Sequence, residues 1–220
     1  MEGLEAVVFD LDGTLLDTLE DLTDSVNAAL REYGCEEKTV DQVRAYVGNG
    51  IKNLMIRSVS QGEAHPDFDG IFEAFRKHYK RNCRNKTKPY PGIMDLLRAL
   101  KADGKKLAIV SNKADFAVKE LNKYYFGEFQ MTAIGEQKGV ARKPAPDSVF
   151  AALKELSVPA GRAVYVGDSD VDIKTALHAG LPCISVLWGF RDREFLEENG
   201  AQFIAEDTAG LSELLNRGLK

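Results

Sequence analysis

The pattern of hydrophobic and polar positions divides this chain into three parts: a single apolar strand, a helical stretch, and a stretch in which strands and helices alternate. Residues 4–9 form a short, nearly continuous apolar run, which is typical of a parallel strand covered on both faces. From residue 18 to 84 the apolar residues recur at helical spacing, and no strand pattern is convincing. A turn-prone segment, Lys88–Gly92, follows, and beyond it strand and helix patterns alternate.

The predicted elements have definite bounds. Thr18 is expected to cap the first helix, with Asp21 as a capping-box partner, and Gly34 to end it. The other elements, in chain order, are helices at 40–46, 51–59, 71–79 and 93–102, a strand at 106–111, a helix at 116–124, a strand at 131–134, a helix at 147–156 that Pro146 begins, a strand at 163–166, a helix at 170–179, a strand at 183–187, and a final strand and helix.

Strands separated by helices of this length indicate a doubly wound parallel sheet. We therefore predict an α/β protein with a Rossmann-like core formed by residues 1–16 and 85–220. An all-helical domain, residues 17–84, is inserted between the first and second strands of that core.

Composition narrows the classes of protein that fit. The apolar fraction of 44% and the charged fraction of 29% are ordinary for a soluble globular protein. A net charge of −5 argues against a general nucleic-acid or anionic-membrane binder. Cys35, Cys83 and Cys183 lack the spacing of a disulfide framework or zinc site. No signal peptide or membrane span is evident, so we expect a cytoplasmic protein. We also expect it to be a monomer or a small homo-oligomer.

Polar residues follow several of the predicted strands. Asp10 and Asp12 end the first strand, Ser111-Asn112-Lys113 follows the second, and Gly167-Asp168-Ser169 follows a later one. Arg142-Lys143-Pro144 precedes a helix. In a parallel sheet these positions converge on one edge, where they can surround a small ligand. Neighbouring carboxylates repel each other, so either a cation or a shared chemical task is expected to compensate for the repulsion.

This set of segments resembles the haloacid dehalogenase superfamily of phosphatases. Asp10–Thr14 is similar to the first motif of that family, Ser111 to the second, Lys143 to the third, and Gly167 through Asp172 to the fourth. Their order and separations also match, from residue 7 to about residue 186. The helical insertion is placed where this family carries its helical cap.

The resemblance implies a role for each residue. Asp10 would attack phosphorus and form an aspartyl-phosphate, and Asp12 would act as general acid and then general base. Mg²⁺ would be held by Asp10, Asp168 and the backbone carbonyl of Asp12. Ser111 and Lys143 would bind the phosphoryl oxygens. Further residues expected at the site are Gly13, Thr14 and Asn112 toward the substrate, with Ser169 and Asp172 in support.

Simpler interpretations compete with several of these roles. Asp10 and Asp12 could be loop residues, Ser111 a helix cap, and Arg142 could replace Lys143. Asp170 fits a cap or first-turn acid. The basic positions between residues 76 and 88 fit a solvated helix face, or a surface that steers an anionic substrate.

The expected substrate rests on weaker features. Gly48-Asn49-Gly50 suits either an interhelix turn or a backbone that approaches a small anionic ligand. This loop and residues 187–191 resemble the phosphoglycolate phosphatase subgroup. The resemblance implies a Mg²⁺-dependent phosphomonoesterase acting on a small phosphorylated metabolite, chiefly 2-phosphoglycolate.

Other activities of the superfamily remain open. These are a β-phosphoglucomutase-like phosphomutase, a pyrophosphatase or nucleotide phosphatase, and a non-catalytic phosphate-binding regulatory domain. A phosphonoacetaldehyde hydrolase would need a cap lysine as a Schiff base, and Lys52 is offset by one position from that pattern. A dehalogenase would not be expected to need Asp12.

Overall fold

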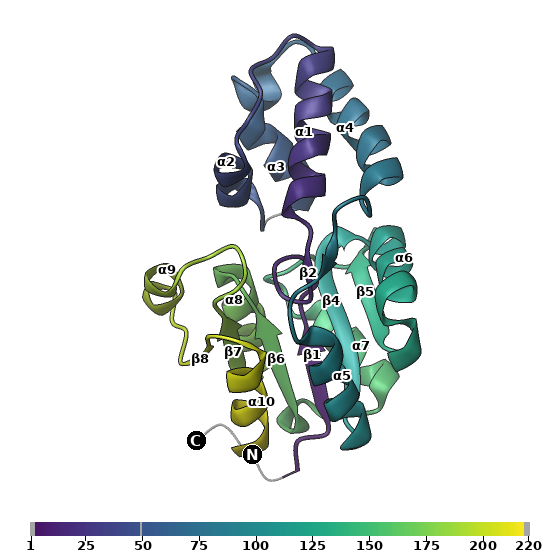
Figure 1. The fold of residues 1–220 in the computed structure, drawn as a ribbon, viewed down its shortest axis with the longest axis vertical. Coiled ribbons are helices and arrows are strands. Elements are labelled where there is room, and N and C mark those ends of the chain that lie inside the picture. Colours follow the sequence, from purple (N-terminus) through teal and green to yellow (C-terminus); the bar gives the residue numbers. More distant parts are fainter. Residues whose placement is uncertain (1–2, 49, 218–220) are drawn as a thin grey trace. The chain divides into compact units, whose positions relative to one another are not determined.

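The computed structural model describes residues 3–48 and 50–217, which divide into two compact units (Figure 1). The sheet unit comprises residues 1–16 and 89–220, and the helical unit comprises residues 17–88. The chain passes between them through β2 (Leu16–Asp17) and β3 (Lys88–Pro89), which form a two-stranded sheet.

The second boundary follows Lys88, whereas the sequence suggested residue 84. The Asp21 carboxylate accepts hydrogen bonds from the backbone N–H groups of Lys86 and Thr87, at 3.0 and 2.8 Å. It also accepts one from the Thr87 hydroxyl at 2.8 Å. These bonds fasten residues 86 and 87 to the first helix, so they belong to the helical unit. They also replace the predicted capping pair, because the Thr18 side chain makes no capping bond.

The sheet unit is built on six strands in the order β5-β4-β1-β6-β7-β8, with every described pairing parallel. Strand β1 lies at the centre, with Phe9 opposite Ile109 on one side and Val166 on the other. This confirms the predicted doubly wound α/β fold. The strands are β1 Ala6–Phe9, β4 Lys106–Ala114, β5 Thr132–Glu136, β6 Ala163–Gly167, β7 Cys183–Val186 and β8 Phe203–Ala205.

Helices cover both faces of this sheet (Figure 1). Successive side chains of a strand point to opposite faces, so Val7 and Phe9 join one apolar core while Ala6 and Val8 join the other. The helices are α5 Ile93–Ala102, α6 Asp115–Phe126, α7 Asp147–Leu156, α8 Asp170–Ala179, α9 Arg193–Glu198 and α10 Thr208–Arg217, with short 3₁₀ turns η2 Gly127–Phe129 and η3 Ala160–Arg162. Residues of α5, α6 and α10 line the first core, and residues of α7 and α8 line the second.

Several details of the sheet unit differ from the sequence-based expectation. Strand β4 continues to Ala114 and does not end at Ser111. Pro146 is the N-cap residue of α7 and does not lie in its first turn, although the helix starts at Asp147 as predicted. Helix α9 was not predicted, because its six residues are too few for a periodic pattern; the Asp192 side chain caps it by accepting from Phe195 N–H at 2.9 Å.

The helical unit contains α1 Leu19–Glu32, α2 Val40–Tyr46, α3 Gly50–Ser58, η1 Gly62–Ala64 and α4 Phe68–Asn82. Its core includes the buried side chains of Val26, Leu30, Ile71 and Phe75, at helical spacing on α1 and α4. Within the described part of residues 18–84 there is no strand, as the sequence predicted.

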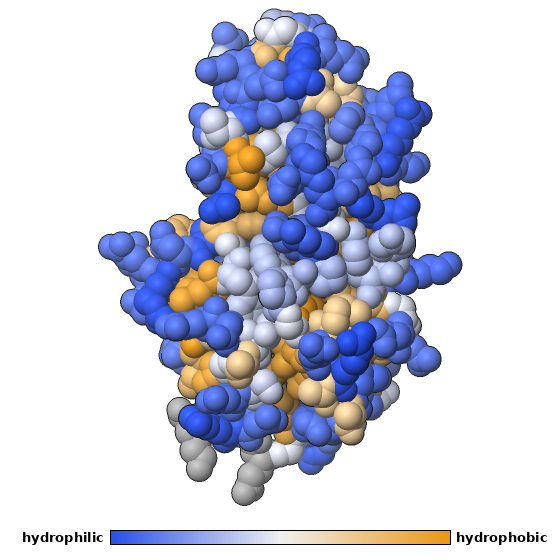
Figure 2. All heavy atoms as spheres, viewed as in Figure 1, coloured by the Kyte–Doolittle hydropathy of each residue, from blue (hydrophilic) through white to orange (hydrophobic). Residues whose placement is uncertain are grey.

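The face seen in Figure 2 is mostly hydrophilic, with small apolar patches between charged side chains. Among the described residues, none of the helices combines the length and apolarity that crossing a membrane requires.

Candidate active site

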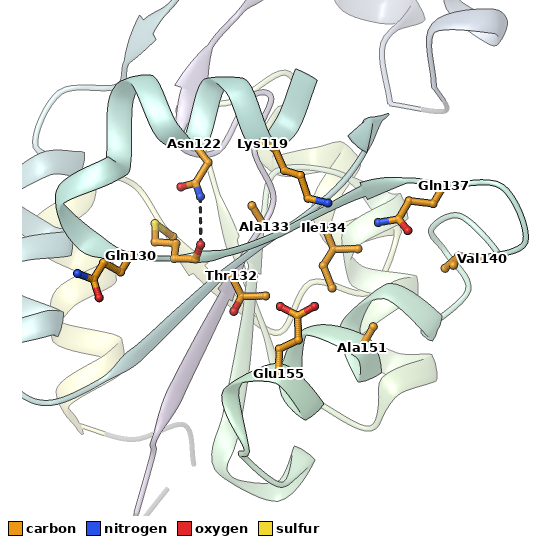
Figure 3. A pocket seen from close by; sticks show the side chains of 11 residues that line it. Lys119, Asn122, Gln130, Thr132, Ala133, Ile134, Gln137, Val140, Ala151 and Glu155 are labelled. Carbon is orange, nitrogen blue, oxygen red and sulfur yellow. Dashed lines mark hydrogen bonds between the residues drawn. The ribbon is translucent and has the colours of Figure 1, made fainter. Parts of the chain in front are cut away.

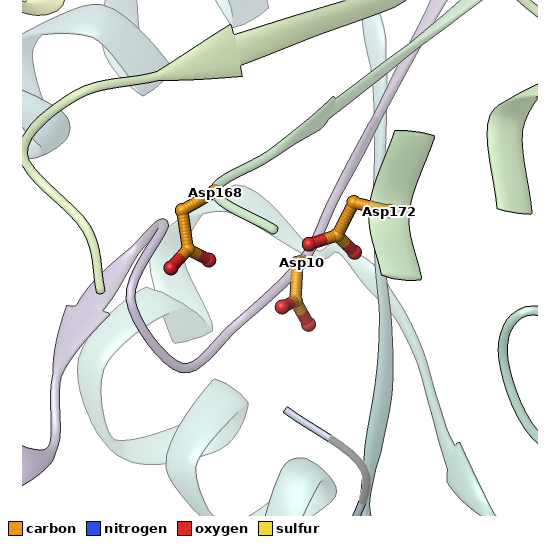
Figure 4. Close-up of side chains that lie close together, drawn as sticks. All are labelled: Asp10, Asp168 and Asp172. Carbon is orange, nitrogen blue, oxygen red and sulfur yellow. The ribbon is translucent and has the colours of Figure 1, made fainter. Parts of the chain in front are cut away.

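Three buried carboxylates meet at the carboxyl ends of β1 and β6 (Figure 4). Asp10 directly follows β1, Asp168 directly follows β6, and Asp172 lies in the first turn of α8. One oxygen of each lies within 4.8 Å of the others. They converge because β1 and β6 are adjacent parallel strands, and the Asp10 N–H donates to the Val166 carbonyl at 2.9 Å.

Lys143 is the cation inside this cluster. Its Nζ lies 2.9 Å from Asp10 Oδ1, 2.7 Å from Asp172 Oδ1 and 3.0 Å from the Tyr165 hydroxyl. Arg142 is exposed, which decides between the two basic neighbours for this position. Burial by itself lowers the pKa of Lys143, but Asp10 and Asp172 outweigh that effect and raise its pKa overall. Lys143 therefore stays protonated.

Asp172 is fully engaged by protein groups. Its Oδ1 accepts from Lys143 and, at 2.9 Å, from the Tyr165 hydroxyl, and its Oδ2 accepts from the Ser169 hydroxyl at 2.6 Å. Ser169 precedes α8, and Asp170 pairs with Lys174 at 2.7 Å in the first turn of that helix. Asp172 thus anchors Lys143, and Asp170 lies in an exposed helical ion pair.

Asp168 is held by two other segments of the sheet unit. Its Oδ1 accepts from the Thr14 hydroxyl at 3.0 Å, and its Oδ2 accepts from the Phe190 backbone N–H at 2.8 Å. Burial raises the pKa of Asp168 to about 7, and the negative charge of Asp172 contributes to this rise. Burial also raises the pKa of Asp10 well above its usual range, although Lys143 opposes the shift.

The cluster is short of positive charge, which is what a divalent cation would supply. Asp10, Asp168 and Asp172 are buried together, and the described ion pairs to them come from Lys143. Because Asp172 is saturated by its hydrogen bonds, the oxygens of Asp10 and Asp168 are the better candidates for ligands. Carboxylate oxygens are the ligands that Mg²⁺ prefers in proteins, so these residues fit that ion.

Asp12 lies in a different ion pair. Its two carboxylate oxygens accept from Lys113 Nζ at 2.7 and 3.0 Å. Lys113 was expected only as a neighbour of Ser111, and its contact with Asp12 was not predicted. No local signal identified this pair, because β4 extends past Ser111 without an apolar pattern and its register shifts between Val110 and Ala114.

The other residues of the second motif are also buried here. The Ser111 hydroxyl accepts from the Lys113 N–H at 3.2 Å, and Ala114, not Ser111, is the N-cap residue of α6. The Asn112 amide donates to the Lys143 carbonyl at 3.0 Å. Asn112 therefore holds the backbone of Lys143.

Glycines allow the loops of the site to interlock. Gly13 has φ of +88°, and a Cβ there would lie 2.4 Å from Asp168 Oδ2. A Cβ on Gly189 would lie 2.3 Å from Asp168 Cβ and 2.5 Å from the Gly13 carbonyl. The Trp188 indole N–H donates to the Thr14 carbonyl at 2.9 Å. Residues 188–190 thus pack on the first and fourth motifs, a contact that the sequence did not reveal.

The loop expected to approach the substrate, Gly48-Asn49-Gly50, belongs to the helical unit. Gly48 and Gly50 have φ of +126° and +79°, and Asn49 lies outside the described residues. Lys52 forms an exposed ion pair with Glu63. In the basic run, Arg76 pairs with Glu73 at 3.1 Å, which is consistent with a solvated helix face.

A separate cavity of about 470 Å³ lies in the sheet unit along β5, between α6 and α7 (Figure 3). Its lining includes Lys119, Thr132, Gln137 and Glu155, and none of the site residues predicted from the sequence. It is distinct from the carboxylate cluster.

The profile of the haloacid dehalogenase-like hydrolase family matches residues 7–186. The chain belongs to this family. A phosphoglycolate phosphatase of Aquifex aeolicus (strain VF5) is 37% identical over 193 residues, covering 85% of this chain and 86% of the relative. The predicted family and enzyme class, a phosphoric monoester hydrolase, are therefore confirmed.

Two solved structures are similar to this chain over most of its length. A protein of Lactobacillus delbrueckii subsp. bulgaricus, provisionally named a phosphoglycolate phosphatase, has a TM-score of 0.91 and 35% identity, covering 97% of this chain and 98% of its own. CbbY from Rhodobacter sphaeroides, solved in complex with phosphate, has a TM-score of 0.76 and 28% identity, covering 94% of this chain and 96% of its own.

Proposed function

We propose that this protein hydrolyses a small phosphomonoester, 2-phosphoglycolate above others, in a Mg²⁺-dependent reaction through an aspartyl-phosphate on Asp10. The observation that carries the proposal is the placement of Asp10. Its carboxylate is buried at the carboxyl end of the central strand β1, 2.9 Å from Lys143 Nζ and beside Asp168. A nucleophile, a fixed positive charge and a second carboxylate thereby share one small site.

Asp10, Asp168 and the backbone carbonyl of Asp12 would hold Mg²⁺. When bound, the ion would neutralise the charge of the carboxylates and orient the substrate phosphate for in-line attack. The raised pKa values of Asp10 and Asp168 are consistent with this assignment, because burial and the neighbouring carboxylates disfavour their charged forms, which a bound cation would stabilise.

The chemical steps fall to residues of the sheet unit. In the first step an Asp10 oxygen bonds to phosphorus, the bond to the leaving oxygen breaks, and Asp12 gives its proton to that oxygen. In the second step Asp12 takes a proton from water, the water oxygen bonds to phosphorus, and the bond to Asp10 breaks. Lys143 and Ser111 would bind the remaining phosphoryl oxygens, with Asn112 and Asp172 holding Lys143.

The proposed substrate is inferred from the names of the relatives and from the helical unit. The Aquifex aeolicus relative is named a phosphoglycolate phosphatase, and CbbY binds phosphate. We propose that the helical unit is the cap that excludes water and selects the leaving group, with residues 48–50 and Lys52 as its contacts.

The test is a panel of phosphate esters, pyrophosphate, a nucleoside monophosphate and β-glucose 1-phosphate, each assayed with and without Mg²⁺. We expect 2-phosphoglycolate to have the highest kcat/KM, with phosphate release lost on chelation. Asp10→Asn should lose at least about 10³-fold in kcat, whereas Asp170→Asn, in the exposed pair with Lys174, should retain activity. Isomerised glucose 6-phosphate without phosphate release would overturn hydrolysis, and an active Asp10→Asn would overturn the nucleophile.

A further inference from the structure

We propose that Lys113 is a positioning residue for proton transfer, which holds the Asp12 carboxylate in place for both steps of the reaction. The inference rests on the proposed function, since it takes Asp12 as the proton donor and acceptor. What it adds is a second lysine with a task of its own: Lys143 holds Asp10, and Lys113 holds Asp12.

The geometry of the pair is that of a fixed contact. Lys113 Nζ lies 2.7 Å from Asp12 Oδ1 and 3.0 Å from Asp12 Oδ2, so a single ammonium group contacts both oxygens. The Lys113 side chain is only 3% exposed, and that of Asp12 is 16% exposed. Such shielding strengthens the attraction relative to a surface pair and limits rotation of the carboxylate. Asp12 keeps enough exposure for its carboxylate to meet a ligand.

The fold fixes the lysine from the backbone side as well. Strand β4 runs alongside β1 and continues past its end to Ala114, which carries Lys113 to the level of the first motif. The next strand, β5, packs tightly here: a Cβ on Gly135 would lie 2.6 Å from the Lys113 carbonyl and 2.5 Å from Asp115 Cα. The Lys113 N–H also donates to the Ser111 hydroxyl at 3.2 Å. Lys113 is therefore placed by its neighbours, and Asp12 by Lys113.

Proton transfer needs a donor within hydrogen-bond reach of a defined atom, so a rotating Asp12 side chain would transfer protons less often. The loss should depend on the leaving group. An alkoxide needs the proton of Asp12 when the phosphoryl bond breaks, whereas 4-nitrophenolate leaves readily without it. Hydrolysis of the aspartyl-phosphate needs Asp12 as a base whichever substrate formed it.

The experiment compares Lys113→Met, Lys113→Arg and the control Lys119→Met in the full chain, with 2-phosphoglycolate and 4-nitrophenyl phosphate. Lys119 is a suitable control because it also pairs with an aspartate, Asp115, at 2.7 Å, but its side chain is 59% exposed. For Lys113→Met we expect kcat on 2-phosphoglycolate to fall about 10- to 100-fold with KM nearly unchanged, a part of the full effect of acid–base catalysis.

With 4-nitrophenyl phosphate, the same variant should form the phosphoenzyme at nearly the wild-type rate in a rapid-mixing experiment. It should then turn over slowly, giving a burst of nitrophenolate. Lys113→Arg should restore most of kcat, because a guanidinium can also contact both carboxylate oxygens. Thermal unfolding establishes that the variants are folded; if Lys113→Met is not, Lys113→Gln takes its place in the same comparison.

Three results would overturn the proposal. A raised KM with unchanged kcat would make Lys113 a substrate-binding group, and equal loss of the rapid phase on both substrates would make it a general structural group. Additivity of Lys113→Met with Asp12→Asn would also overturn it, because a residue that acts through Asp12 has no further effect once Asp12 is removed. Failure of the proposed function gives a different result: Asp12→Asn itself would retain wild-type turnover.

Discussion

The sheet unit and the helical unit use charged residues in opposite ways. In the sheet unit, Lys113 and Lys143 are buried against carboxylates that lie far away in the sequence. These carboxylates follow β1 or lie in the first turn of α8. In the helical unit, charged pairs such as Arg31–Glu37 and Lys86–Asp24 are exposed, whether they join near neighbours or distant residues. Buried pairs cost much free energy to break, and exposed pairs cost little. This difference is consistent with our proposal that residues of the sheet unit carry out the reaction and that the helical unit selects the substrate.

The largest expected effect is at Lys143. Lys143→Met removes the cation between Asp10 and Asp172, leaving two buried carboxylates without it. Breaking such a pair should lower the free energy of unfolding by about 3 kcal/mol near pH 8, and activity should be lost. Urea denaturation measures the loss, with Lys174→Met, from an exposed pair, as the control. An equal loss in both variants would remove the difference between buried and exposed pairs.

Gly189→Ala should have the next largest effect. A Cβ there would meet Asp168 and the Gly13 carbonyl, so the loop must shift and displace the Asp168 carboxylate. We expect Mg²⁺ affinity, measured by calorimetry, to fall about 10- to 100-fold. Gly161→Ala is the matched control, because a Cβ on Gly161 meets nothing within 4 Å. Unchanged affinity in Gly189→Ala would remove Asp168 from the metal site.

The pH dependence of the stability of the metal-free protein tests whether the buried carboxylates lack a compensating positive charge. The pKa of Asp168 is about 7 when folded, above its ordinary value near 4 when unfolded. The folded state therefore binds this proton more tightly, and its stabilisation is full below about pH 4 and lost as pH rises through 7. Between pH 8 and 5, stability in the presence of a chelator should rise by up to about 1.4 kcal/mol per pH unit from this group.

Thermal unfolding across this range measures the effect, and Asp168→Asn should flatten its slope. Added Mg²⁺ should stabilise the protein more at pH 8 than at pH 6, since protons compete with the ion. The same slope in wild type and Asp168→Asn would assign the titration to another group.

The smallest effect is expected in the helical unit. Lys52→Gln breaks an exposed pair with Glu63, so the free energy of unfolding should change by less than about 1 kcal/mol. Turnover of an aryl phosphate should stay within about threefold, while the preference for 2-phosphoglycolate over other esters changes more. Equal losses on all substrates would contradict a selectivity role for this unit.

Much of the fold could be predicted because its signals are local. Helices α2, α5, α7 and α8 have the predicted bounds, since each carries an apolar period and a start or stop signal within a few residues. The apolar run before Asp10 likewise predicted a buried strand, and β1 is fully buried at the sheet centre. Helix α9 and the extension of β4 escaped because they have no apolar pattern of their own.

The candidate site also has a part that local sequence signals predicted and a part that they did not. The sequence determined which residue types follow the predicted strands, Asp10, Asp12, Ser111 and Asp168, and that Lys143 precedes a helix. The tertiary structure decided which of them touch. Lys113 meets Asp12 across 101 positions, Thr14 meets Asp168 across 154, and Trp188 meets Thr14 across 174. A local pattern cannot specify such pairs, because they depend on strand order, on how far each strand runs and on how closely the loops pack.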